Sequence, residues 1–140
     1  ETLFFGNDLV HDAHVKEMKQ GVIQLYAQII EITEKPMVPI GQLDTNPQGE
    51  MFEIDESMLG KRSHRAILDV GSLDISSDYL ITDDDDIEFM GSSSDMLVID
   101  IHNNDQGYKV GDFIRFDLKY MGALTLLNSD YVEKRIINKD

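Results

Sequence analysis

The stretch GVIQLYAQIIEIT, residues 21–33, decides the fold that the sequence predicts. Apolar residues alternate with polar ones in its first part, at Ile23, Leu25, Ala27 and Ile29. A period of two is typical of a strand with one buried face. The phase changes at the adjacent pair Ile29 and Ile30, after which Ile32 continues the apolar set. We therefore expect a long strand that carries a bulge or leaves one sheet to join another.

Further strand patterns follow along the chain, and turn-rich segments such as DTNPQG, GSLDISSD and HNNDQG separate them. The expected strands are residues 51–54, 64–70, 86–90, 95–101 and 112–118. Many short strands joined by turns predict a mainly β domain, a small barrel or a sandwich. Pro36 and Pro39 disfavour a central strand around PMVP and indicate an edge or an extended loop.

Two short helices complete the expected fold. One lies near residues 11–19, and the other covers residues 120–128, where Tyr120, Ala123, Leu124 and Leu127 follow helical spacing. We expect the core to be built from apolar residues of the strands: Leu25, Ile29, Ile67, Val70, Leu97, Ile99, Ile114 and Phe116.

The charge of the chain restricts its classes of partner. The chain contains 12 Lys and Arg residues and 27 Asp and Glu residues, which gives a formal net charge of -15. Such a charge repels nucleic acid and anionic membrane surfaces. The 140 residues suit one domain, residues 1–140. No apolar run approaches the ~20 residues that a membrane-spanning helix needs. The absence of cysteine favours a reducing compartment, and the cytoplasm is the expected location. Because Glu1 opens directly into an apolar stretch, we expect a piece of a longer protein.

Three polar motifs invite a chemical interpretation, but none forms a complete site. HDAH, residues 11–14, offers two imidazoles, and two ligands do not close a metal site. DDDD, residues 83–86, lacks the alternating ligands and the glycine of a calcium loop, so we expect an exposed turn. SSSD, residues 92–95, lacks the elbow motif of serine hydrolases. We predict no metal site, and residue chemistry by itself indicates only an acidic β domain.

The order of the motifs adds a resemblance to a known family. The chain resembles the C-terminal β domain of alanine-racemase-type amino-acid racemases, which depend on pyridoxal 5'-phosphate, and above all their ornithine-racemase-like branch. The motifs that carry this resemblance are ETLFFG (1–6), YAQIIEITEKPMVPIG (26–41), AILDVGSLDIS (66–76), GSSSDMLVIDI (91–101), VGDFIRFDL (110–118) and SDYVEKRI (129–136). Together they cover nearly the whole chain in the family's order.

The resemblance implies an architecture and a set of partners. In this family, fold-type III, a (β/α)₈ barrel precedes the β domain and carries the lysine that holds the cofactor. The implied function of residues 1–140 is to set substrate specificity and to form a homodimer, in which the domain closes over the partner's barrel. The isolated chain is then expected to be inactive.

The resemblance also assigns candidate site residues. The family's catalytic tyrosine aligns with Ile40, which cannot transfer a proton, so Asp44 and Asp74 are the candidate proton-transfer residues. Ser72, Ser94 and Asp95 align with positions that contact the substrate. Polar and acidic groups at these positions favour a basic substrate such as ornithine or lysine. The candidates for contacting the cofactor phosphate are Glu1 and Thr2, through their backbone, and Tyr131.

Two other classes of function remain open. The chain could be an autonomous acidic β module that binds a basic small molecule or protein. It could also be the β domain of a related lyase or decarboxylase that uses the same cofactor.

Overall fold

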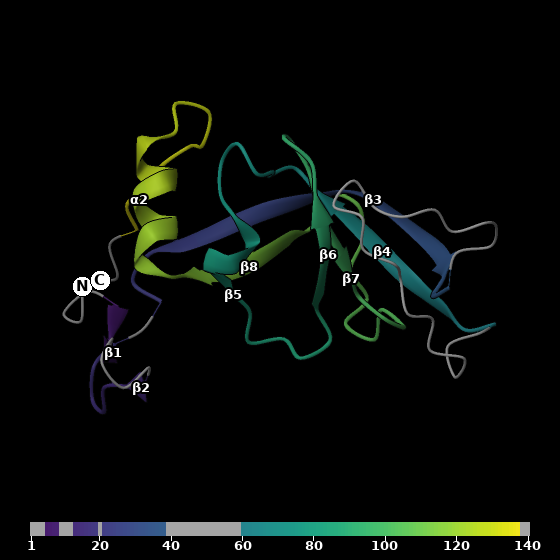
Figure 1. Ribbon diagram of the computed structural model, residues 1–140, viewed down its shortest axis with the longest axis horizontal. Coiled ribbons are helices and arrows are strands. Elements are labelled where there is room, and N and C mark those ends of the chain that lie inside the picture. Colours follow the sequence, from purple (N-terminus) through teal and green to yellow (C-terminus); the bar gives the residue numbers. More distant parts are fainter. Residues whose placement is uncertain (1–4, 9–12, 20, 39–59, 138–140) are drawn as a thin grey trace, which may run out of the picture.

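A computed structural model describes residues 5–8, 13–19, 21–38 and 60–137 of the chain (Figure 1). Six antiparallel strands form one sheet in the order β5-β8-β3-β4-β7-β6, and the sheet curls into an open half-barrel. Its strands are β3 (Gln24–Pro36), β4 (Arg62–Leu68), β5 (Leu80–Ile81), β6 (Glu88–Ser92), β7 (Leu97–Asp100) and β8 (Phe113–Leu118). The remaining elements are β1 (Asn7–Asp8) paired with β2 (Ala13–His14), the short 3₁₀ helix η2 (Ser77–Tyr79) and the helix α2 (Tyr120–Asn128). The predicted mainly β, barrel-like fold is confirmed.

The long strand β3 is shared between two sets of partners. Residues 24–28 pair with β8, and residues from Ile29 to Pro36 pair with β4. The register with β4 shifts between Ile29 and Glu31, where the sequence changes phase. Of the two predicted alternatives, the bulge is therefore confirmed, and β3 changes its partner there within a single sheet.

The backbone groups at this change of partner are all hydrogen-bonded. The Gln28 amide donates to the Asp69 carboxylate at 2.7 Å, and the Gln28 carbonyl accepts from the Asp69 amide at 3.1 Å. Ile29 is held on its other side, where its amide donates to the Asp112 carbonyl and its carbonyl accepts from the Gly111 amide, both at 2.8 Å. Since unpaired buried backbone groups cost roughly 1–3 kcal/mol each, these bonds stabilise the bend.

The core lies on one face of the curled sheet. Seven of the eight expected core residues are buried: Leu25, Ile29, Val70, Leu97, Ile99, Ile114 and Phe116. The prediction for Ile67 was wrong, because this residue is only half-buried. It lies between the fully buried Ala66 and Leu68, so the alternation of β4 turns its side chain to the opposite face of the sheet.

The predicted strands are largely confirmed, with ends shifted by no more than three residues. The strand expected at 64–70 is β4, and those expected at 86–90, 95–101 and 112–118 are β6, β7 and β8. Pro36 is the last residue of β3. It lies in the part of the strand that pairs with β4 on one side only, as the prediction of an edge requires. The expected strand at 51–54 and Pro39 lie outside the described residues.

The helix expected at 120–128 is confirmed as α2. Gly122, Ala123 and Leu126 face the core, whereas Leu124 and Leu127 are exposed. Gly122 explains the orientation, since a Cβ there would lie 2.8 Å from the Cβ of Tyr79 on η2. The helix approaches η2 through the residue that has no side chain.

The helix expected near residues 11–19 was wrong over its described part. Ala13 and His14 form β2, and Lys16 and Glu17 form a turn. The Val15 amide donates to the Gly6 carbonyl at 2.7 Å, so this segment pairs with preceding residues, and the Met18 amide closes the turn by donating to the Val15 carbonyl at 3.2 Å. None of the helices in the described residues is long and apolar enough to cross a membrane.

Gly71, which follows β4, allows two loops to approach closely. A Cβ at this buried residue would overlap the Ser94 carbonyl oxygen and lie 2.5 Å from the Asp95 backbone nitrogen. These are backbone atoms of the connection between β6 and β7. A backbone cannot rotate out of the way as a flexible side chain can.

We expect Gly71→Ala to lower the free energy of unfolding of the chain by about 1–3 kcal/mol, the usual cost of overpacking. Urea unfolding followed by circular dichroism measures this change. Gly91→Ala is the matched control, because a Cβ at Gly91 would meet no atom within 4 Å, and we expect a change within about 0.5 kcal/mol. Equal stability of the two variants would contradict the close contact.

Candidate functional site

Two loops that the sequence assigns to the substrate lie against each other. In the turn after β4, the Ser72 amide donates a hydrogen bond to the Ser93 carbonyl at 2.9 Å. The Leu73 amide donates to the Ser94 carbonyl at 3.0 Å. The Ser72 hydroxyl also donates to the Ser93 carbonyl at 3.0 Å. The structure therefore brings the predicted residues Ser72, Ser94 and Asp95 together from loops that are distant in sequence.

The end of α2 joins the same region through Asp74. The Ser129 hydroxyl donates to the half-buried Asp74 carboxylate at 3.4 Å and accepts from the Tyr131 amide at 3.2 Å. The Tyr131 side chain itself is 96% exposed. We call this assembly of residues 71–75, 93–96 and 129–131 the rim.

The rim presents two carboxylates without a basic partner. Asp95 is exposed and accepts a hydrogen bond from the Ser94 hydroxyl at 2.7 Å, and Asp74 accepts from Ser129. Within residues 5–8, 13–19, 21–38 and 60–137, no Lys, Arg or His forms an ion pair with either carboxylate. Carboxylates flanked by hydroxyl groups are suited to accept hydrogen bonds from an ammonium group.

The other candidate residues are not all placed. Glu1, Thr2, Ile40, Asp44 and His11 lie outside the described residues. Among the residues that the structure describes, no group of three or more His, Asp or Glu side chains could hold a metal ion.

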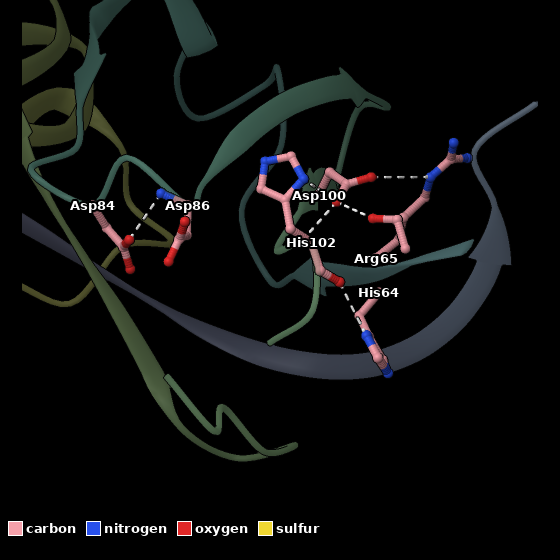
Figure 2. Close-up of polar contacts among 7 residues, drawn as sticks. His64, Arg65, Asp84, Asp86, Asp100 and His102 are labelled. Atoms are coloured by element: carbon pink, nitrogen blue, oxygen red, sulfur yellow. Dashed lines mark hydrogen bonds and ion pairs between the residues drawn. The ribbon is translucent and has the colours of Figure 1, made fainter. Parts of the chain in front are cut away.

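A buried polar cluster between β4 and β7 escaped the sequence analysis (Figure 2). The buried Asp100 carboxylate accepts from the Ser63 hydroxyl and, at 2.8 Å, from the His102 amide. The His102 ring lies 3.5 Å from the same carboxylate, and Arg65 Nε lies 4.0 Å from its second oxygen. Arg65 Nε is buried and has no hydrogen-bond acceptor among the described residues. The cluster fastens the turn after β7 to the sheet.

The run of aspartates at 83–86 forms a turn, and its members differ. Asp83, Asp85 and Asp86 are exposed, as predicted, whereas Asp84 is half-buried. Asp84 accepts hydrogen bonds from the Tyr108 hydroxyl at 2.8 Å and from the Asp86 amide at 3.0 Å, the second of which Figure 2 shows. Burial, assisted by the hydrogen bond and the charge of Asp84, raises the pKa of Tyr108 from 10.0 to about 12.

Two curated proteins are similar to the chain over nearly all of its length. The ornithine racemase of Acetoanaerobium sticklandii is 33% identical over 137 residues, which are 98% of this chain and 38% of that protein. The lysine racemase of Thermotoga maritima is 33% identical over 135 residues, which are 96% of this chain and 37% of that protein. No protein-family model matches the chain, and no solved structure matches it.

The expected resemblance to ornithine-racemase-like amino-acid racemases is therefore confirmed. The chain spans a little over a third of the length of the two relatives.

We expect Asp84→Asn to lower the pKa of Tyr108 back toward 10, because the substitution removes the negative charge beside the phenol. Absorbance of tyrosinate during an alkaline titration measures this shift. Since the pKa is raised in the folded state, Tyr108 stabilises the fold below pH 10, and this contribution is lost between pH 10 and about 12. Asp85→Asn is the control, since Asp85 does not contribute to the shift; an identical titration of both variants would contradict the assignment.

Proposed function

We propose that the chain is the C-terminal β domain of an amino-acid racemase that depends on pyridoxal 5'-phosphate and acts on ornithine or another basic amino acid. The observation that carries this proposal is the similarity, over 96–98% of the chain, to two racemases whose named substrates are both basic amino acids. The carboxylates of the rim, which form no ion pair with another described residue, support the same substrate class, because they would bind a side-chain ammonium group.

Within this proposal the rim determines substrate specificity. Asp95 is exposed and held by Ser94, so it would receive the ammonium group of the substrate, and Ser72 would line the approach. A carboxylate at this place favours a basic side chain over an apolar one by charge pairing and leaves an alanine side chain without a partner.

The cofactor would be held mainly by the part of the protein that this chain does not span. Pyridoxal phosphate supplies, when bound, the electron sink that makes the Cα proton removable. Tyr131 is suited to contact its phosphate, because the phenol is exposed while the Tyr131 backbone is fixed by Ser129. Glu1 and Thr2 would add backbone amides.

Racemisation requires a proton-transfer group on each face of the substrate. Ile40 replaces the family's tyrosine, so we assign this role to Asp44 or Asp74. Asp74 has a favourable position, since it is half-buried and its Ser129 partner would orient the carboxylate. The second proton-transfer group would lie on the preceding barrel, and the barrel of a partner subunit in a homodimer would complete the site.

The proposal predicts that the full-length protein removes the optical activity of L-ornithine or L-lysine faster than that of L-alanine or L-serine, without releasing ammonia or carbon dioxide. Polarimetry and chiral chromatography measure the reaction. Release of ammonia or carbon dioxide would instead identify a lyase or decarboxylase. A parent gene without a barrel upstream of this chain would favour an autonomous binding module.

The aspartates are tested by single substitutions in the full-length protein. We expect Asp44→Asn or Asp74→Asn to slow racemisation and exchange of the Cα proton with deuterium by ~10²–10⁴-fold, the usual loss of a general acid or base. Asp95→Asn should mainly raise KM for ornithine, and the exposed Asp78→Asn serves as a control. Unchanged exchange in both the 44 and 74 variants would place the proton donor outside this domain.

A further inference from the structure

The helix α2 carries apolar residues on its outward side as well as on the side that faces the core. Its sequence, YMGALTLLN, contains no charged residue in a chain with a formal net charge of -15. Gly122, Ala123 and Leu126 face the core. A helix with large apolar residues on both of these sides is normally covered on both. The composition of α2 therefore indicates that its outward side is also covered in the complete protein.

The outward side of α2 carries four large apolar residues that together we call the outer face: Tyr120, Met121, Leu124 and Leu127. Their exposed fractions lie between 37% and 54%. Residues three and four apart are neighbours on a helix, so these side chains form one continuous patch. Patches of this kind on soluble proteins mark contact surfaces.

One contact already made by the outer face indicates the direction from which it is covered. Phe5 packs edge-on against Tyr120, with ring centroids 5.8 Å apart and an interplanar angle of 86°. Figure 1 shows β1 at the same end of the molecule as α2, away from the tip of β3 and β4. Residues that precede the sheet in sequence therefore reach the helix, and an adjoining domain joined by a short connection would lie beside it.

We propose that the outer face of α2 docks against the larger, adjoining part of the same polypeptide, the part of the racemase relatives that this chain does not span. This inference rests on the proposed function, which makes the chain one domain of a longer protein. The relatives are long enough to supply such a covering domain, since the chain spans only 37–38% of them. The docked surface would be apolar, because the outer face offers no charge to pair.

The absence of cysteine from the chain allows a direct measurement of this contact. In the full-length protein, Leu124→Cys and Leu127→Cys introduce one thiol each on the outer face, and Val110→Cys places one in an exposed turn as control. The rate of maleimide labelling of each introduced thiol is compared between native protein and protein in urea. The full-length protein without an introduced thiol gives the background.

We expect native labelling at positions 124 and 127 to be slowed by roughly tenfold or more relative to urea, since a docked surface reacts only after local opening. Labelling at position 110 should remain fast. Native labelling at 124 that is as fast as in urea would overturn the proposal, because it would show the outer face open to solvent.

Crosslinking identifies what covers the face. A thiol-to-amine crosslinker is attached at position 124 in a mixture of ¹⁴N- and ¹⁵N-labelled full-length protein. We expect crosslinked peptides to join this chain to the adjoining part of the same polypeptide and to carry a single isotope label. Peptides that combine both labels would show that a second copy covers the face, and would overturn the proposal.

The outcome is independent of the racemase assay. If the thiols are protected by the same polypeptide but no amino acid loses its optical activity, the docking stands and the proposed function fails. If racemisation occurs and the thiols label freely, the proposed function stands and the docking is wrong.

Discussion

The fold depends on the change of partner in the middle of β3. The first part of β3 pairs with β8, and the second part pairs with β4. One strand can serve both partners only if the backbone bends between them, and the bend leaves backbone groups that need new partners. Asp69 and the turn at Gly111 and Asp112 provide them. The curl of the half-barrel follows from this bend, since it turns β8 and β5 away from the plane of β4, β7 and β6.

The rim is a consequence of the same geometry. The bend brings Asp69 to the backbone of Gln28, and the chain then passes through Gly71 into the turn that meets the connection between β6 and β7. Ser129, at the end of α2, reaches Asp74 from the other side. Three segments therefore present their polar groups at one place, although hydrogen bonds between main-chain atoms do most of the positioning. Such a scaffold allows the exposed side chains to differ between relatives while the loops keep their arrangement.

Local patterns were sufficient to predict much of the fold. The alternation and phase change of residues 21–33 predicted β3 and its bulge, and burial of seven of the eight expected core residues follows from the same periodicity. Patterns were insufficient where a long-range contact decides. The orientation of α2 depends on Gly122 approaching Tyr79, and the helical spacing of the apolar residues does not reveal which side of the helix faces the core. Asp100 is buried because register places it opposite Arg65 and near Ser63, which no local pattern reveals. The rim residues were predicted from the family resemblance, and contacts between segments distant in sequence bring Ser72, Asp74 and Asp95 to one place in the structure.

The pairing of β3 also has a consequence for the time course of folding. Its second part pairs with β4, the next strand of the sheet in sequence. Its first part pairs with β8, and the side-chain bond from Gln24 to Asp117 spans 93 positions of the chain. Contacts so distant in sequence form late, because the cost of closing the loop comes before the contact is made. During synthesis on a ribosome, β3 and β4 emerge well before β8. In that interval the first part of β3 offers an unpaired edge, of the kind that binds chaperones or the strands of other nascent chains.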